Sequence, residues 1–305
     1  MALYSFSVLI VNYHGREDTI KCVKSVLLAA EMADISVKIL VVDNSNDDFK
    51  FSEQSVHVQR TGHNIGLSGA WYIGFYSEVV QSCDYVIFLN NDAILHQNFF
   101  LEINKGIDKW GSDCAFGPRI CYENNHDLIW SRGGYIKRFA VSVKHFGESL
   151  PADQVERRDF ETGHISGCCM ILRTEHLNTI GGPDTNFFFR GEEWDINYRL
   201  LKAGVSLVIL DHAEVFHEIN GSHSRFDPGM LYFAYRAKVL FAKKILPWWY
   251  FPIWYLAGLT FSATVAPRRF AQVSGGEVSI IRKALMSAFL IGLKENKILP
   301  LSHKL

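Results

Sequence analysis

The most constraining feature of this 305-residue chain is a series of apolar runs that each end in a polar residue. They read SFSVLIVN at 5–12, VKILVVDNS at 37–45 and DYVIFLNND at 84–92. Runs of this kind are typical of strands that are buried on both faces of a sheet. The segments between them predict helices, one at 19–33 and one following a glycine-rich loop within 62–80. Strands that alternate with helices indicate an α/β fold with a parallel sheet.

Asn12, Asp43 and Asp92 stand where these three predicted strands end. Ligands of open α/β sheets bind beyond the carboxyl ends of the strands, and crossover connections place successive ends at the same edge. We therefore expect the three polar side chains to converge on one ligand site. Taken singly, each is better explained as a turn residue, because Asn and Asp favour bends.

The stretch FLNNDAIL at 88–95 suggests that the ligand site holds a hard cation. Mg²⁺ is usually bound by one or two carboxylates together with phosphate and water, so Asp92 is the first candidate ligand. His217 follows a later apolar run and is the second, although imidazole suits Mn²⁺ better than Mg²⁺. Asn90 and Asn91 are uncharged, and we expect them to shape the turn or to hydrogen-bond a ligand.

Three carboxylates lie close together in EEWDINYRLLKAG at 192–204, a segment that predicts a helix. Glu192, Glu193 and Asp195 at a helix start are stabilised by the helix dipole and need no function. Crowding of like charges can also raise a carboxylate pKa toward working pH, which suits a general base. Both interpretations stay open, and the spacing does not choose among the three.

Sequence motifs, net charge and cysteine spacing argue against several other classes of protein. The first predicted strand is followed by YHGRED rather than by G-x-G-x-x-G, which argues against a nicotinamide-dependent enzyme. A formal net charge of −1 gives no general case for nucleic-acid binding. The six cysteines show no C-x-x-C spacing, and we expect reduced thiols that serve as small core residues. No secretory signal pattern is apparent, so we expect a cytoplasmic protein.

The last quarter of the chain differs from the rest in charge and hydropathy. Residues 226–305 contain 11 Lys and Arg against 3 Asp and Glu, whereas residues 1–225 contain 20 against 29. Residues 245–266 carry no charge but include Pro247 and Pro252. They could lie in a membrane interface, pack in the core or a homodimer surface, or span the membrane. A basic amphipathic helix is predicted at 278–297.

This pattern predicts two units: residues 1–225, and a helical extension at 226–305 that associates with a membrane. The protein would then be peripheral on the inner face of the cell membrane.

Taken together, seven stretches resemble the family 2 glycosyltransferases, which have the GT-A fold, and especially their rhamnosyltransferase-like branch. In chain order they are SVLIVNYHGRE, ILVVDNSNDD, GHNIGLSGAWYIGF, YVIFLNNDAIL, ISGCCMILRTEHLNTIGGPDTNFF, GEEWDINYRLLKAG and AEVFH. They cover about residues 5–220. The resemblance implies inverting transfer of a sugar, with rhamnose as one candidate, from a nucleotide-diphosphate donor to a hydroxyl of a glycan or lipid-linked acceptor in surface polysaccharide synthesis.

The resemblance also implies roles for individual residues. Those expected to contact the nucleotide or the donor are Val11, Tyr13, Asp43, Asn64, Gly66 and Asn91. Asp92 matches the last acidic position of a D-x-D-like metal motif, and His217 matches a histidine near the metal or diphosphate. Glu193 matches the catalytic base. Two departures are visible: the metal motif is Asn-Asn-Asp, and the base is Glu rather than Asp, which leaves Glu192 and Asp195 as substitutes.

Two other functions remain as alternatives. A sugar nucleotidyltransferase also combines an α/β nucleotide-binding fold with a metal, but would carry a Gly-rich, basic loop after the first strand, which NYHGRED fits poorly. A non-catalytic sugar-nucleotide-binding protein would have lost its base, whereas this chain keeps Asp92, Glu193 and His217 together.

Overall fold

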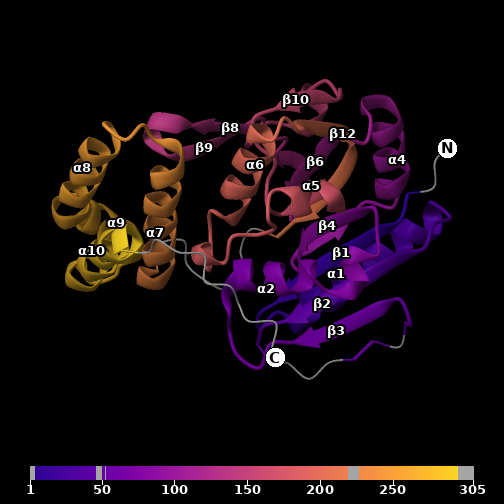
Figure 1. Ribbon diagram of the computed structural model, residues 1–305, viewed down its shortest axis with the longest axis horizontal. Coiled ribbons are helices and arrows are strands. Elements are labelled where there is room, and N and C mark those ends of the chain that lie inside the picture. The colour runs from indigo at the N-terminus through magenta and orange to yellow at the C-terminus, as the bar shows by residue number, and fades with distance from the viewer. Residues whose placement is uncertain (1–3, 46–49, 52, 219–226, 295–305) are drawn as a thin grey trace.

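The protein is a mixed α/β sheet flanked by helices, with a group of helices at one side (Figure 1). The computed structural model describes residues 4–45, 50–51, 53–218 and 227–294. The predicted fold class, a GT-A-like sheet with a helical C-terminal extension, is confirmed. The boundary at residue 225 between the two units stays a prediction.

The main sheet has the strand order β10-β12-β6-β11-β4-β1-β2-β3, with β5 paired to β12 and β7 paired to β6. The neighbouring strands β4, β1, β2 and β3 are all parallel to one another, and β11 runs antiparallel to β4. The strands of the main sheet are β1 (Phe6–Asn12), β2 (Val37–Asp43), β3 (Val56–Arg60), β4 (Tyr85–Asn90), β5 (Ala93–Leu95), β6 (Cys114–Tyr122), β7 (Asn125–Ser131), β10 (Phe160–Thr162), β11 (Cys169–Arg173) and β12 (Ser206–His217).

The three apolar runs form the centre of the sheet as predicted, because every residue of β1 is buried and β2 and β4 are almost wholly so. Two apolar layers cover the two faces, one including α1 and α4 and the other including α2 and α6. All six cysteines are buried and free. The helices of this part are α1 (Arg16–Met32), α2 (Gly66–Phe75), α3 (Glu78–Gln81), α4 (Phe99–Trp110), α5 (Thr174–Thr179) and α6 (Glu192–Lys202).

The polar and aromatic sequence at 111–160 has weak periodicity, from which we expect irregular structure or a short hairpin; this expectation is wrong in part. The hairpin exists, formed by β8 (Gly134–Lys137) and β9 (Ser142–His145), but β6 is a buried nine-residue strand of the main sheet. Strand β6 contains Arg119, whose fully buried guanidinium donates to both carboxylate oxygens of Asp211 on β12 at 3.0 and 2.8 Å. Asp211 follows Arg119 by 92 residues, so local periodicity cannot show that the Arg119 charge is neutralised and that β6 is a core strand.

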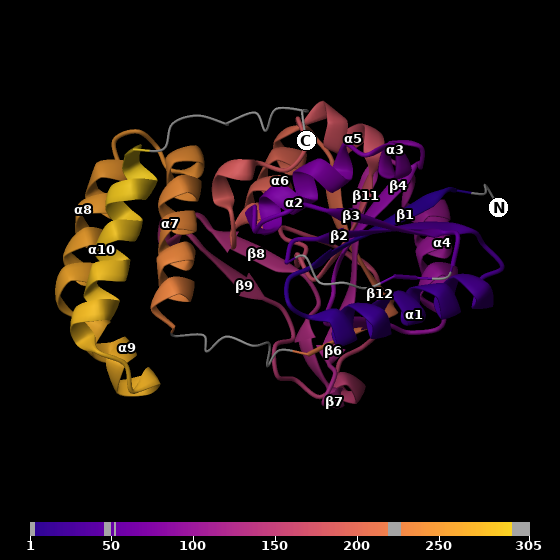
Figure 2. The ribbon, with the colours of Figure 1, turned by 90° about the horizontal axis from the view of Figure 1, so that it is seen from below.

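Four helices complete the chain: α7 (Pro228–Ile245), α8 (Phe251–Thr264), α9 (Ala266–Ser274) and α10 (Val278–Lys294). Figure 2 shows α7, α8 and α10 side by side, with α9 at one end of the group. Helix α7 joins this group to the sheet, because its Arg236 donates to the carbonyl oxygens of Phe187 and Asn186. Within the described residues, no helix has both the length and the apolar character needed to cross a membrane.

Candidate active site

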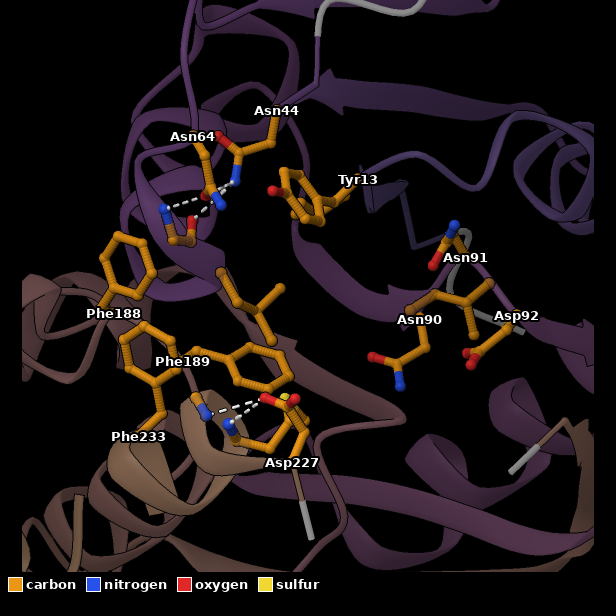
Figure 3. Close-up of a pocket in the computed structure, with 16 residues that line it drawn as sticks. Tyr13, Asn44, Asn64, Asn90, Asn91, Asp92, Phe188, Phe189, Asp227 and Phe233 are labelled. Atoms are coloured by element: carbon orange, nitrogen blue, oxygen red, sulfur yellow. Dashed lines mark hydrogen bonds between the residues drawn. The ribbon is translucent and has the colours of Figure 1, made fainter. Parts of the chain in front are cut away.

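The carboxyl ends of β1, β2 and β4 meet at one edge of the sheet, as the sequence predicts. Asn12 pairs with Asp43, and Val11 pairs with Asn90 on the other side. Beside this edge lies a pocket of about 500 Å³, a size typical of small-molecule sites (Figure 3). It is lined by Val11, Tyr13, Asn44, Asn64, Gly66, Leu67, Leu89, Asn90, Asn91, Asp92, Phe188, Phe189, Asp227, Gly229, Met230 and Phe233.

One wall of the pocket is a loop held by amide side chains. The Asn44 amide donates to Asn64 Oδ1 at 3.0 Å and its Oδ1 accepts from the Ile65 amide at 2.9 Å. Asn64 Oδ1 also accepts from the Gly66 amide. Gly66 has φ +79°, and a Cβ there would lie 2.4 Å from the Phe188 carbonyl oxygen, so only glycine fits this close approach. The loop is therefore fixed before any ligand binds.

Asp43 is the last residue of β2. It is fully buried, is not among the residues that line the pocket, and its Oδ1 accepts from Asn12 Nδ2 and from Ser45. Its neighbour Asn44 reaches the pocket instead. The Asp43 Oδ1 atom thus links the ends of β1 and β2, whereas its Oδ2 atom has no hydrogen-bond partner among the described residues. A contact between Asp43 and a nucleotide stays a prediction.

Asp92 and His217 are brought together by strand pairing. Strand β5 runs antiparallel to the end of β12, so that Ala93, the residue after Asp92, pairs with His217. The Asp92 Oδ1 and His217 Nε2 atoms are 3.1 Å apart, and the Asn90 amide lies 3.3 Å from the same imidazole nitrogen. The carboxylate faces the pocket, while the imidazole is almost completely buried beside the Trp130 ring.

The electrostatic surroundings of His217 favour its protonated form. Burial by itself lowers its pKa, but contacts with Cys168 and Asp92 outweigh that effect and raise the pKa well above the usual value. A positive charge is thus stabilised at this point, either on the imidazole or on a cation that replaces its proton. One carboxylate and one imidazole suit a divalent ion that takes its other ligands from phosphate and water. Among the described residues, no group of three or more His, Cys, Asp or Glu side chains could enclose a metal by itself.

The side chain of Asn91 points toward α1. Its amide lies 3.1 Å from Thr19 Oγ1 and 3.4 Å from the Gly15 carbonyl oxygen, and both contacts are donated by Asn91. These bonds hold the turn between β4 and β5, which agrees with the expectation that the asparagines shape the turn. Asn90 instead faces His217.

The three carboxylates at the start of α6 have three different environments. Asp195 is fully buried and forms ion pairs with Arg199 on its own helix and with Lys244 at the end of α7. Lys244 also pairs with Asp184. With a cation on each oxygen, Asp195 serves to attach α6 to α7.

Glu192 and Glu193 both have a raised pKa. Burial, followed by the charge of Glu193, raises the pKa of Glu192 well above that of an ordinary carboxyl group. Its Oε2 is buried and has no hydrogen-bond partner. Burial also raises the pKa of Glu193, while backbone hydrogen bonds and the Arg190 guanidinium oppose the increase. Carboxyl groups whose pKa is raised by burial and by a neighbouring carboxylate are a recurrent feature of active sites.

Glu193 is connected to the Asp92–His217 pair through the turn before β11. A Cβ on Gly167 would lie 3.1 Å from Glu193 Cβ, so the side chain packs directly on this glycine. The carbonyl oxygen of the next residue, Cys168, accepts a hydrogen bond from the backbone N–H of Asn90, and its side chain interacts electrostatically with His217. Glu193 and Asp92 are therefore both neighbours of one short turn, although Glu193 is not among the residues that line the pocket.

The aromatic wall of the pocket was not predicted. Phe188 and Phe189 precede α6, and Phe233 comes from α7; Phe188 and Phe233 are stacked with ring centroids 5.0 Å apart (Figure 3). Phe188 has φ +60°, which is strained for a bulky residue and is a feature of ligand-contacting segments. The run FFFR before the acidic cluster was the available signal.

Comparison with known proteins identifies the family. The model of glycosyl transferase family 2 matches residues 7–181, which is more than half of the chain. The chain belongs to this family.

Two related glycosyltransferases of known function are similar in sequence. The N-acetylglucosaminyl-diphospho-decaprenol L-rhamnosyltransferase of Mycobacterium tuberculosis is 31% identical over 108 residues, 35% of each chain. Rhamnosyltransferase WbbL of Escherichia coli is 26% identical over 236 residues, 70% of this chain and 83% of that one.

Solved glycosyltransferase structures share the fold of this one. GalNAc-T7 with UDP, GalNAc and Mn²⁺ superposes with a TM-score of 0.60 at 17% identity, over 94% of this chain and 55% of that one. Residues 1–349 of S. aureus TarS superpose with a TM-score of 0.52 at 13% identity, over 97% and 94% of the two chains. The similarity confirms the GT-A-like architecture of the chain. The match to the mycobacterial rhamnosyltransferase spans about a third of that protein.

Proposed function

We propose that this glycosyltransferase moves a sugar, with inversion, from a nucleotide-diphosphate donor to a hydroxyl group of a glycan or lipid-linked acceptor. The observation that supports the proposal is that the turn at 166–168 connects the pocket-facing Asp92 with the carboxylate of Glu193, which packs on Gly167. The nucleotide would lie along Val11, Tyr13, Asn44 and the loop at 64–66. Glu193 would take the acceptor proton as the acceptor oxygen attacks the anomeric carbon.

A divalent cation, Mg²⁺ or Mn²⁺, would be held by Asp92 and His217. Bound there, it would neutralise the charge that builds up on the leaving diphosphate. Asp92 contributes a carboxylate that faces the pocket, and Asn90 restrains the His217 imidazole beside it. The surroundings that favour a protonated imidazole favour a bound cation for the same electrostatic reason, and the cation would displace the proton.

Rhamnose is the proposed sugar, and a diphosphate-lipid-linked glycan is the proposed acceptor, because both rhamnosyltransferases named above are related in sequence. The pathway would be surface polysaccharide synthesis. A lipid-linked acceptor requires an enzyme at the inner face of the cell membrane, and the apolar, basic C-terminal helices suit that location. A homodimer is compatible with this proposal.

The decisive experiment is a screen of the purified protein against a panel of nucleotide sugars, with and without EDTA. We expect slow release of nucleoside diphosphate from one donor, loss of release in EDTA, and recovery with Mg²⁺ or Mn²⁺. Release of pyrophosphate would instead identify a nucleotidyltransferase. Binding without turnover of any donor would identify a non-catalytic sugar-nucleotide-binding protein, and full turnover in EDTA would contradict the metal site.

A further inference from the structure

Two elements that are far apart in the sequence meet at one corner of the molecule. They are the tip of the β8–β9 hairpin, residues 137–140, and the corner at 246–250 between α7 and α8 (Figure 1). The Phe139 ring lies edge-on to Tyr250, with centroids 5.1 Å apart. The Arg138 Nε donates to the Ile245 carbonyl oxygen at 2.7 Å. These contacts fix the hairpin tip against the helical corner.

This corner exposes large aromatic side chains. Trp248 is 86% exposed, Trp249 55% and Phe139 53%. Folded proteins seldom leave contiguous apolar groups of this size in water unless a partner covers them. Tryptophan is enriched at membrane–water interfaces, where its ring meets an apolar and a polar medium together.

Helix α8 extends the apolar surface away from the corner. It contains no charged residue, and Ile253 and Leu256 on its outer side are 59% and 61% exposed. Its inner side is already used, since Tyr255 packs with Val239 and Phe289. A helix that is apolar all round is normally buried on every side. At 14 residues, about 21 Å, α8 suits a position in the plane of an interface.

The same surface leads back to the active-site pocket. Helix α8 is followed by α9, whose first residue, Ala266, packs with Leu231 in the first turn of α7. The residue before Leu231 is Met230, which lines the pocket. A plane that lies along α8 therefore runs from the Trp248 corner to the end of α7 where the pocket is formed.

The charge of the β8–β9 hairpin and of helices α7 to α9 indicates which kind of partner covers the exposed aromatic surface. Residues 134–145 and 228–276 together contain nine Lys and Arg and no Asp or Glu. The exposed ones include Lys137, Arg138, Lys144, Arg268 and Arg269, whereas Arg236 is buried and Lys244 is paired with Asp184 and Asp195. A second copy of the chain related by a twofold axis would bring the same acid-free surface against itself, and like charges would repel. An anionic lipid surface instead attracts juxtaposed lysines and arginines and accepts tryptophan at the headgroup level.

We propose that Phe139, Trp248, Trp249, Ile253 and Leu256 form one docking surface for an anionic membrane, with Lys137 at its basic rim. The β8–β9 hairpin is thus part of the membrane-binding unit together with the C-terminal helices. The inference refines the membrane location in the proposed function. It does not rest on the transfer chemistry, which is measured separately.

The test is co-sedimentation of the full chain with vesicles. The protein should pellet with vesicles that contain phosphatidylglycerol, pellet less with pure phosphatidylcholine, and be released as salt increases. Trp248→Ser with Trp249→Ser, and separately Phe139→Ser, should each lower the partition coefficient by about tenfold or more. Lys137→Ala should lower it by about fivefold, as expected for one surface charge.

Matched control substitutions are available on α1, which lies in the sheet domain outside the proposed docking surface. Leu28→Ser removes a similarly exposed apolar side chain, and Lys24→Ala removes an exposed charge; both should bind vesicles as the unchanged protein does. Nucleoside diphosphate release from soluble donor, measured without vesicles, should be the same in all variants. Phe139→Ser that binds like the unchanged protein would exclude the hairpin. Failure of the unchanged protein to bind, or a concentration-dependent dimer that the tryptophan variants abolish, would overturn the membrane assignment.

Discussion

Asp92 and Asp195 are both carboxylates that the sequence proposes for the active site, but their neighbours differ. Asp195 is fully buried, and Arg199 and Lys244 each pair with one of its oxygens. The Asp92 side chain is 24% exposed and meets an imidazole, with no Lys or Arg pairing to it among the residues that the structure describes. Where the fold uses a carboxylate for stability, it provides the cations itself. Where the carboxylate faces the pocket, we expect a ligand to provide the cation.

Glu193→Gln should have the largest effect on turnover. The amide has nearly the same shape but cannot accept the acceptor proton, so kcat should fall by about 10²–10⁴-fold while donor affinity stays unchanged. The measurement is nucleoside diphosphate release with saturating donor and acceptor, alongside donor binding by calorimetry. Glu192→Gln is the matched control, because it makes the same change at the adjacent carboxyl group. If Glu192→Gln causes the larger loss, the base is Glu192.

Asp92→Asn should lower turnover by about 10²–10³-fold, the range found when one electrostatic stabiliser of developing charge is removed. It should also weaken Mn²⁺ binding in the presence of nucleoside diphosphate, because the amide oxygen is a poorer ligand than carboxylate. Calorimetric titration with Mn²⁺ measures this directly. Asp18→Asn, which neutralises a surface carboxylate on α1, is the control and should change neither quantity. Normal Mn²⁺ affinity in Asp92→Asn would remove Asp92 from the metal site.

Asp195→Asn tests the other side of the comparison. It leaves Arg199 and Lys244 without their buried anion, and removal of one partner of a buried pair costs about 3–5 kcal/mol. The free energy of unfolding, from urea denaturation, should fall by roughly that amount. Asp18→Asn breaks an exposed pair with Lys21 and should change the free energy of unfolding by less than about 1 kcal/mol. Equal effects of the two substitutions would contradict the structural role given to Asp195.

Much of the site could be predicted because it depends on strand ends. Buried apolar strands are recognisable locally, and their parallel order brings Val11, Asn91 and Asp92 to one edge. Contacts that depend on distant partners were not predictable. Strand β6 was missed because Arg119 is acceptable in a core only when Asp211 neutralises it.

The aromatic wall was missed for a related reason. Phe233 lies on α7, a helix that the charge balance assigns to the C-terminal extension, yet it stacks on Phe188 in the pocket. At the end of β2, a difference of one residue decided which side chain is exposed to the pocket: Asn44 lines it and Asp43 does not. Periodicity predicts that a strand ends there but does not determine the direction of each side chain after the end.

Glu192→Gln should have the smallest effect and bears on stability rather than turnover. In the unfolded chain a glutamate has a pKa of about 4.3. In the folded protein, burial and the Glu193 charge raise the pKa of Glu192 above that value. Between these two values the folded state binds more protons, so the free energy of unfolding decreases as pH rises, by at most about 1.4 kcal/mol per pH unit for this one group. Gln cannot titrate and should flatten this decrease and stabilise the protein at pH 7. Urea denaturation between pH 5 and 7 measures the slope, and Glu175→Gln at an exposed site on α5 should leave it unchanged. A slope as steep in Glu192→Gln as in the unchanged protein would mean that Glu192 is ionised in the folded state.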